Sequence, residues 1–228
     1  MHFLRTAPEL SSSQSREILA ALAQLPKQGE KIYDERNQQL YRLQAGDLDL
    51  VAKIYHLQSA KWKLSALLKH SRGRRSYRSG TQLLKLGIPT PMPLLLKEEG
   101  TGLSIQKVTL VCAYFEGLTL REHLRSEIPL PDDAVDQLVA IFTSLHQANL
   151  HHGDFHTANL LVSPNGKFTL IDLDGMKKQR TSSESKLLRD KARLLRSIEE
   201  DAKETHFYDA VAKALGPLGK PLPFVTST

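Results

Sequence analysis

Two spacings of apolar residues along the chain separate predicted strands from predicted helices. From Lys31 to Leu57, in KIYDERNQQLYRLQAGDLDLVAKIYHL, apolar residues alternate with polar ones, and two turn sequences, DERN and AGD, interrupt the alternation. Period two is typical of strands with one buried face. This stretch therefore predicts three antiparallel strands, preceded by a short helix in QSREILAALAQL that ends before Pro26 and Gly29.

The next part of the chain mixes helices and strands. Helical spacing predicts helices in SAKWKLSALLKH, residues 59–70, and in SYRSGTQLLKL, which stops at Gly87. The prolines of IPTPMP that follow predict an extended connector. LSIQKVTLVCAYF, residues 103–115, predicts a strand, and LTLREHL begins a short helix.

The C-terminal half predicts a helix, a loop, a hairpin and further helices. In PDDAVDQLVAIFTSLHQANL apolar residues recur at helical spacing, and we expect Asp132 and Asp133 in the first turn, where the helix dipole favours negative charge. NLLV and FTLIDLD flank the turn sequence SPNGK and predict a β-hairpin. Residues 182–215 are mostly helical in pattern. This order predicts an α+β fold with an N-terminal sheet and a helical C-terminal half.

Length and composition are typical of a soluble globular protein. The 228 residues fit one large domain or two small lobes. We find no apolar run typical of a signal peptide or long enough to span a bilayer. The one cysteine, Cys112, excludes a disulfide within the chain, and the apolar VTLVCAYF around it predicts a buried thiol. We therefore expect a reducing, cytoplasmic setting.

The net charge of +6 is unevenly distributed. The segment from Leu50 to Lys97 contains no acidic residue, and a second basic stretch, from Lys177 to Arg196, mixes in acids. The basic residues of the first segment are Lys53, Lys61, Lys63, Lys69, Arg72, Arg74, Arg75, Arg78, Lys85 and Lys97. Such segments suit an anionic partner, although a solvated basic face has the same pattern. Aromatic residues are sparse among them, so we expect no nucleic acid partner.

The candidate chemistry lies in LHHGDFHTANLLV, residues 150–162, and in the strand beyond it. Asp154 follows the long helix, Asn159 comes five residues later, and Asp172 ends the apolar FTLID. Because FTLID pairs with NLLV, we expect Asn159 and Asp172 at one end of a small sheet. An amide and a carboxylate oxygen suit Mg²⁺, which takes further oxygens from phosphates and water. Asp154, in the spacing H-x-D-x-x-x-x-N, suits the base of a phosphoryl transfer.

Lys53 is the candidate ligand for the phosphates of ATP. It stands in LDLVAKIYH, the third predicted strand, where an ammonium within apolar sequence indicates an anionic partner. The phosphoryl-transfer template of protein kinases places its lysine on the third strand in a similar context. The alternative is a lysine on the solvent face of an edge strand.

The histidines of the motif allow a different metal site. His152 and Asp154, with His206 as a third ligand, would fit the two-histidine, one-carboxylate iron site of an oxygenase. However, His206 lies in charged helical sequence, and the rest of the motif would have no role. The histidine spacing of zinc hydrolases is absent. We expect His152 to brace the loop, whereas the sequence assigns no role to His151 or His156.

HHGDFHTANLLV with LIDLDG resembles the protein-kinase-like superfamily, in the branch of aminoglycoside, choline and bacterial sugar kinases. SYRSGTQLLKLGIPTPMPL and RDKARLLRS are similar to the lipopolysaccharide core kinases, the Kdo/heptose kinase family of Gram-negative bacteria. The resemblance extends over about residues 30–200. It implies a single bilobal kinase-like domain, with a small antiparallel sheet lobe over about residues 1–112 and a mainly helical lobe over about 113–228.

The resemblance also implies an activity. The chain would be an ATP-dependent kinase that phosphorylates a sugar hydroxyl of Kdo or heptose in the lipopolysaccharide inner core. Asp154 would be the base, Asn159 and Asp172 would hold Mg²⁺, and Lys53 would bind the ATP phosphates.

Two further aspartates and the basic segment gain roles from the resemblance. Asp190 in LLRDKARLL would anchor the backbone of the catalytic loop, unless it is a solvent-exposed helix charge. Asp174 would be an extra metal or water ligand or, more simply, a turn-former before Gly175. The acceptor would be a glycolipid or a phosphorylated sugar. The basic segment 53–97 would bind the anionic membrane surface, at the cytoplasmic face of the inner membrane.

Two parts of the kinase template are missing from the sequence. The turn DERNQQ has no glycine, so the Gly-rich phosphate cover is absent. The helix that should supply a glutamate to pair with Lys53 has none, and Ser76 stands at that place. Either another carboxylate serves or ATP alone orients Lys53. A catalytically inactive kinase-like binding module and a kinase of the aminoglycoside or choline type therefore stay open as alternatives.

Overall fold

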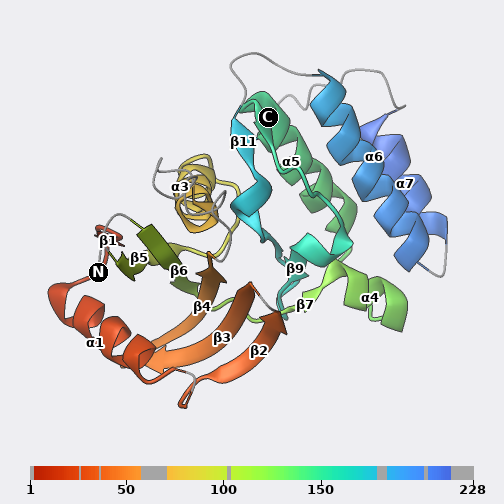
Figure 1. The fold of residues 1–228 in the computed structure, drawn as a ribbon. Coiled ribbons are helices and arrows are strands. Elements are labelled where there is room, and N and C mark those ends of the chain that lie inside the picture. The colour runs from red at the N-terminus through yellow and green to blue at the C-terminus, as the bar shows by residue number, and fades with distance from the viewer. Residues whose placement is uncertain are drawn as a thin grey trace. The chain divides into compact units, whose positions relative to one another are not determined.

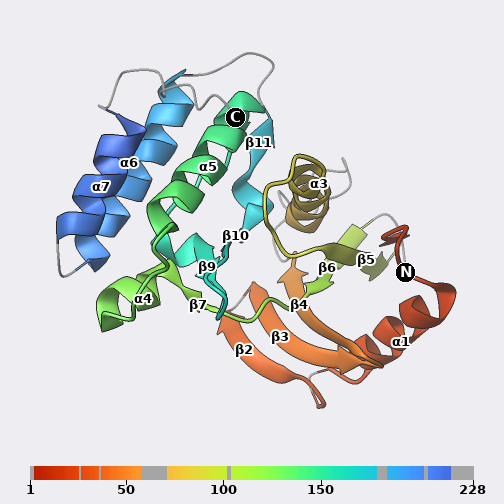
Figure 2. The same cartoon turned by 180° about the vertical axis from the view of Figure 1, so that it is seen from behind.

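The structure is a computed structural model that describes residues 3–25, 27–35, 37–57, 71–101, 104–178, 184–202 and 205–216. It divides into two compact units, shown from opposite sides in Figures 1 and 2. Unit 1 comprises Met1–Gln82 and Pro91–Phe115, and unit 2 comprises Leu83–Thr90 and Glu116–Thr228. The helix predicted at residues 59–70 lies outside the described residues.

Unit 1 is built on a six-stranded antiparallel sheet with the order β1-β5-β6-β4-β3-β2. Its strands are β1 (Phe3–Thr6), β2 (Glu30–Glu35), β3 (Gln38–Ala45), β4 (Leu48–His56), β5 (Pro93–Thr101) and β6 (Ser104–Ala113). The three strands predicted after Pro26 are confirmed as β2, β3 and β4, and the strand predicted at residues 103–115 is confirmed as β6. Strands β1 and β5 are additional to the prediction.

Two helices pack on this sheet. Helix α1 (Ser12–Ala23) contacts β3 and begins with a capping box, in which Ser11 and Gln14 each bind the other's backbone amide. Helix α3 (Arg72–Lys85) confirms the predicted second helix and places Tyr77 in a separate apolar cluster with β6 residues. It approaches the sheet closely at Gly73, where a Cβ would lie 2.5 Å from a methyl group of Val108. Glycine is therefore needed at that crossing.

Unit 2 is mainly helical. Its helices are α4 (Leu120–Ser126), α5 (Ala134–Gln147), α6 (Glu184–Asp201) and α7 (Thr205–Leu215), and α7 packs against both α5 and α6 (Figures 1 and 2). Leu138 and Phe142 of α5 lie in the core, as the helical stripe predicts. The prediction that Asp132 and Asp133 lie in the first turn of α5 is wrong. Asp133 is the residue before the helix and makes no capping bond, so Asp136 is the acid of the first turn.

Short strands carry the polar loops of unit 2. They are β7 (Leu118–Thr119), β8 (Leu150–His151), β9 (Leu160–Val162), β10 (Phe168–Leu170) and β11 (Lys177–Lys178), with the 3₁₀ turns η1 (Thr157–Asn159) and η2 (Leu173–Gly175). β9 and β10 form the predicted hairpin. Its turn requires Gly166, whose φ of 76° is unfavourable for other residues and whose amide donates to the Ser163 carbonyl.

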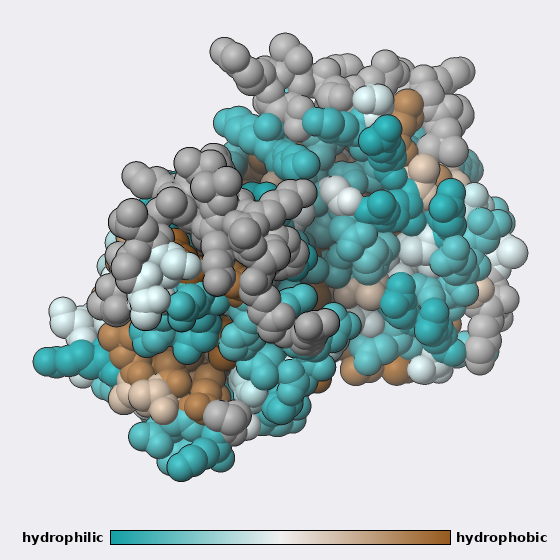
Figure 3. All heavy atoms as spheres, in the orientation of Figure 1, coloured by the Kyte–Doolittle hydropathy of each residue, from teal (hydrophilic) through white to brown (hydrophobic). Residues whose placement is uncertain are grey.

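The surface differs in character between regions. In the orientation of Figure 1, hydrophobic side chains gather on unit 1 over α1, whereas α6 and α7 present mostly hydrophilic side chains (Figure 3). Partly buried leucines of α1 and its flanks, among them Leu19, Leu22 and Leu25, belong to the apolar cluster there. No helix within the described ranges combines the length and the apolar character that crossing a bilayer requires.

Candidate active site

The β9–β10 hairpin brings Asn159 next to the strand end that carries Asp172. Leu160 pairs with Leu170, and beyond this pair the Ile171 amide donates to the Asn159 carbonyl at 3.0 Å. Asp172 then leaves the strand with φ 58° and ψ 61°, a left-handed conformation that aspartate tolerates better than most residues. The two candidate metal ligands therefore lie at the same end of the hairpin, as the sequence predicts.

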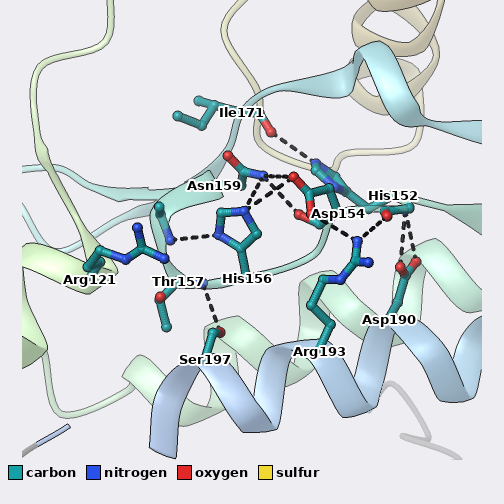
Figure 4. Close-up of polar contacts among 12 residues, drawn as sticks. Arg121, His152, Asp154, His156, Thr157, Asn159, Ile171, Asp190, Arg193 and Ser197 are labelled. Atoms are coloured by element: carbon teal, nitrogen blue, oxygen red, sulfur yellow. Dashed lines mark hydrogen bonds and ion pairs between the residues drawn. The ribbon is translucent and has the colours of Figure 1, made fainter. Parts of the chain in front are cut away.

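The side-chain amide of Asn159 is oriented by Asp154. Its Nδ2 donates to the backbone carbonyl of Asp154 at 2.8 Å and lies 3.5 Å from the carboxylate Oδ2 (Figure 4). Because an amide has one donor end and one acceptor end, this contact reserves Oδ1 for another partner. Asn159 Oδ1 and the Asp172 carboxylate are hard oxygen donors of the kind that Mg²⁺ prefers, so these residues fit that metal.

The Asp154 carboxylate is bracketed by two side chains. Its Oδ1 accepts from Arg193 Nη1 at 2.8 Å, and its Oδ2 lies 3.3 Å from His156 Nε2 (Figure 4). Nδ1 of His156 accepts the Ala158 amide at 3.2 Å, and its Nε2 faces both Asp154 Oδ2 and the side-chain amide of Asn159, whose Nδ2 lies 3.2 Å away. About half of the Asp154 side chain stays exposed, so a substrate can reach the carboxylate.

Helix α6 holds the loop that carries Asp154 and Asn159. Four side chains on one face of the helix, spaced three or four residues apart, make the contacts: Asp190, Arg193, Ser197 and Asp201. Asp190 accepts the Gly153 amide at 3.1 and 3.3 Å, and Arg193 donates to the Gly153 carbonyl. The other two accept the amide and the hydroxyl of Thr157. Asp190 is therefore buried and bound, not a solvent-exposed helix charge.

Asp201 is the most heavily bonded of these residues. It is buried and accepts from the Thr157 hydroxyl, from Arg121 at 3.2 Å and from Arg125 at 2.8 Å. Burial alone would raise the pKa of the Asp201 carboxyl, but these hydrogen bonds outweigh it and hold the pKa below its usual 3.8. Asp201 thus stays ionised and ties α4 and α6 to the loop.

His152 braces the loop from the opposite side. Its Nε2 donates to the Ile171 carbonyl at 2.9 Å, and burial lowers the pKa of the imidazole below 6.5. Throughout the described ranges, no three histidine, cysteine, aspartate or glutamate residues gather as a metal site would require. The iron-oxygenase interpretation, with His206 as third ligand, is therefore wrong.

Asp174 lies in the turn that packs against the loop carrying Asp154. It is buried within η2, between Leu173 and Gly175. A Cβ on Gly153, whose φ is 80°, would lie 3.1 Å from the Gly175 carbonyl oxygen. The two glycine-containing loops therefore approach each other closely, and both roles predicted for Asp174 stay predictions.

Lys53 lies on an interior strand of unit 1. β4 runs between β3 and β6, and Lys53 is opposite Leu40 on one side and Leu110 on the other. The edge-strand alternative is therefore wrong. The ammonium lies 5.5 Å from the centroid of the buried Tyr55 ring.

Cys112 on β6, predicted to be buried, is only partly buried. Desolvation raises the pKa of its thiol to about 12, an effect that the positive charge of Lys53 opposes.

Helix α3 has no glutamate, but a buried acidic residue lies opposite it on β5. This residue, Glu98, binds Arg74 rather than Lys53. Glu98 is fully buried, and its two carboxylate oxygens bind Arg74 of α3, while Ser71 donates to Oε1 at 3.1 Å. Ser76, at the place expected for a glutamate, is buried, and its hydroxyl has no hydrogen-bond partner within the described part of the chain. The ion pair between helix and sheet is therefore Arg74–Glu98.

Sequence reasoning missed the contacts of Arg193, Ser197, Asp201 and His156. A signal for the first three was present, because polar residues at positions 190, 193, 197 and 201 fall on one face of a predicted helix. No such signal exists for His156, whose contact with Asp154 depends on the shape of the loop.

Comparisons with known proteins agree on one family. A family model described as the lipopolysaccharide kinase (Kdo/WaaP) family matches residues 23–214. A 3-deoxy-D-manno-octulosonic acid kinase from Vibrio parahaemolyticus is 25% identical over 119 residues, which are 52% of this chain and 49% of that protein. The match thus spans about half the length of this curated relative.

Solved structures support the same fold. A structure of WaaP in complex with acyl carrier protein has a TM-score of 0.63 and 14% identity, covering 91% of this chain and 85% of that one. A crystal structure of WbdD has a TM-score of 0.51 and 15% identity, covering 74% of this chain and 36% of that one. At these identities the likeness concerns the fold alone, and it confirms the predicted kinase-like α+β class. Because the family model spans most of the sequence, the chain belongs to the lipopolysaccharide kinase (Kdo/WaaP) family.

Proposed function

We propose that the protein is an ATP- and Mg²⁺-dependent kinase that phosphorylates a sugar hydroxyl of the lipopolysaccharide inner core. One observation carries the proposal: the half-exposed carboxylate of Asp154 and the amide of Asn159 are bonded within one loop, and Asn159 adjoins Asp172 across the hairpin. This is the residue set of a base and two metal ligands. Membership of the Kdo/WaaP family supports the same reaction class.

Each residue has one task in the proposed reaction. Asp154 accepts the proton of the acceptor hydroxyl while the hydroxyl oxygen bonds to phosphorus and the bond to the ADP oxygen breaks. Asn159 Oδ1 and the Asp172 carboxylate would hold Mg²⁺, and Lys53 would bind the nucleotide phosphates. ATP would supply the phosphoryl group, and bound Mg²⁺ would partly neutralise the negative charge of its phosphates. His152 and Asp190 fix the loop backbone, so that the base and the amide keep their positions.

For the acceptor we favour a hydroxyl of Kdo over one of heptose. The support is the curated relative, which is a Kdo kinase. A panel of acceptors decides between them: a Kdo-bearing lipid A precursor, a heptose-bearing core glycolipid, an aminoglycoside and choline. Transfer to the heptose acceptor alone would reassign the substrate, and transfer to the aminoglycoside or choline would replace the lipopolysaccharide proposal.

The experiment on Asp154 tests the catalytic assignment. Phosphate transfer from radiolabelled ATP is measured for the wild type, Asp154→Asn and Asp132→Asn. Asp132 is an exposed aspartate before α5 and serves as the matched control. We expect Asp154→Asn to lose about 100-fold or more in kcat with ATP binding retained, because positioned bases contribute about 10²–10⁴-fold. Unchanged turnover in Asp154→Asn, or no ATP binding by the wild type, contradicts the proposal.

The proposed place of action is the cytoplasmic face of the inner membrane. Within the described part of segment 53–97, Arg78 and Lys85 are exposed, whereas Arg74 is bound to Glu98 and Lys97 to Glu99. Arg78 and Lys85 are thus exposed charges of the described part that suit anionic headgroups. Sedimentation with phosphatidylglycerol vesicles should weaken in the double variant Arg78→Glu and Lys85→Glu. Equal sedimentation of both proteins, or equal binding to phosphatidylcholine vesicles, contradicts this role.

A further inference from the structure

We propose that Arg193 is the positioning residue for the catalytic base, holding one oxygen of Asp154 so that the other faces the acceptor hydroxyl. This inference rests on the proposed kinase activity. Arg193 lies on α6, and its Nη1 donates both to the Gly153 carbonyl and to Asp154 Oδ1, the latter at 2.8 Å (Figure 4). A single guanidinium nitrogen therefore joins the backbone of the loop to the reacting side chain.

The two carboxylate oxygens of Asp154 are not equivalent. Oδ1 has the short, charge-assisted bond from Arg193. Among the residues that the structure describes, Oδ2 has only longer contacts, at 3.3 Å from His156 Nε2 and at 3.5 Å from Asn159 Nδ2. Hydrogen bonds of this type are normally 2.7–3.2 Å long, so Oδ2 is the oxygen with lone-pair capacity for a substrate proton. Arg193 thus selects which oxygen acts as the base.

The contact with Asp154 contributes orientation rather than stability. The side chains of Arg193 and Asp154 are 49% and 51% exposed, and an ion pair so exposed is strongly screened by water. The loop also has other anchors, because Asp190 binds the Gly153 amide and His152 binds the Ile171 carbonyl. Loss of the guanidinium should therefore free the Asp154 side chain to rotate while the loop backbone stays in place.

The charge of Arg193 has a second consequence for the reaction. The transferred phosphoryl group is anionic, and a carboxylate beside it would repel it. A guanidinium at 2.8 Å offsets part of the charge of Asp154 and so reduces this repulsion. A lysine at this position would keep the charge but not the fixed geometry of the guanidinium.

Steady-state kinetics of Arg193→Met and Arg193→Lys test this inference, with Arg196→Met as the matched control. Arg196 is exposed on the same helix, one residue before Ser197. We expect Arg193→Met to lower kcat about 10- to 100-fold while KM for ATP changes less than about two-fold, as for an interaction that matters in the transition state. Arg193→Lys should recover part of the loss, and Arg196→Met should behave as wild type.

A double-mutant cycle separates positioning from a structural role. If Arg193 acts through Asp154, Arg193→Met has no further effect on the residual rate of Asp154→Asn, whereas a structural defect lowers both backgrounds equally. Wild-type kcat in Arg193→Met, or the same fold-loss in both backgrounds, overturns the inference and leaves the proposed function intact. An inactive wild type overturns the proposed function, and this inference with it.

Discussion

The buried ion pair between Arg74 and Glu98 makes unit 1 sensitive to a single substitution. Glu98 on β5 is completely excluded from solvent, and its carboxylate accepts two bonds from Arg74 and one from Ser71. Arg74 is itself mostly buried, with its guanidinium 4.5 Å from the centroid of the Phe3 ring on β1. We expect Glu98→Gln to destabilise the unit because the substitution leaves Arg74 without its counter-ion.

The size of the effect follows from the contacts that change. A glutamine keeps one oxygen for Ser71 and Arg74 Nε, but its amide nitrogen then faces Arg74 Nη2, a donor against a donor. The variant loses one charge-assisted bond, worth about 1.5–3 kcal/mol, and buries an unpaired charge. Removing one partner of a buried pair costs about 3–5 kcal/mol in general. We therefore expect a loss of about 3 kcal/mol in the free energy of unfolding.

Urea denaturation followed by circular dichroism measures this loss. Glu99→Gln is the matched control, because Glu99 is the next residue on β5 but forms surface ion pairs with Lys97 and Lys107. Surface pairs contribute about 0–1 kcal/mol, so the control should lose no more than that. The double variant Arg74→Met with Glu98→Leu should recover most of the stability, since it removes both charges together. Equal losses for Glu98→Gln and Glu99→Gln would refute the reasoning.

Two further predictions follow from shifted pKa values. Because the pKa of Asp201 is lower in the folded protein than its usual 3.8, its contribution to stability is complete above pH 5 or so and is lost as the pH falls through the folded pKa. The difference in unfolding free energy between wild type and Asp201→Asn should shrink below about pH 4, and a constant difference down to pH 2.5 or so contradicts this. The thiol of Cys112, with its pKa raised to about 12 from 9.0, should react with iodoacetamide at pH 8 roughly 1,000-fold more slowly in the folded protein than in urea. Equal rates in the two states would show that the thiol is not desolvated.

Much of the fold follows from local sequence patterns. Alternation identified β2, β3 and β4, and turn sequences between apolar runs identified the β9–β10 hairpin. β5 was missed because it begins with four buried residues in succession and is paired on both sides, so it lacks the alternation of a half-exposed strand. β1 has only four residues and is recognisable only through its pairing with β5. Alternation thus identifies strands better than burial on both faces does, even where, as in β2, the strand is exposed along its whole length.

The candidate site divides in the same way. The spacing of Asp154 and Asn159 and the hairpin that carries Asp172 are local features, so their arrangement could be predicted. The contact of Arg193 with Asp154 joins residues 39 positions apart and exists only because α6 packs against the loop. The absence of acidic residues from segment 53–97 made the whole segment look available to an anionic partner, although one of its charges is neutralised by a residue outside it. Arg74 is neutralised by Glu98, which directly follows that segment in the sequence and lies across from α3 in the fold.

The Arg74–Glu98 pair also explains how helix α3 functions without a glutamate of its own. In the kinase template one lysine binds the nucleotide phosphates and also pairs with a glutamate on the neighbouring helix. Here the charges are exchanged: the helix supplies the basic residue, Arg74, and the sheet supplies the acidic one, Glu98. α3 is therefore fixed to β5 by charges that do not include Lys53. If Lys53 binds ATP as proposed, Lys53→Met should weaken nucleotide binding. Glu98→Gln should instead lower the unfolding free energy of unit 1, because the Arg74–Glu98 pair anchors α3 to β5.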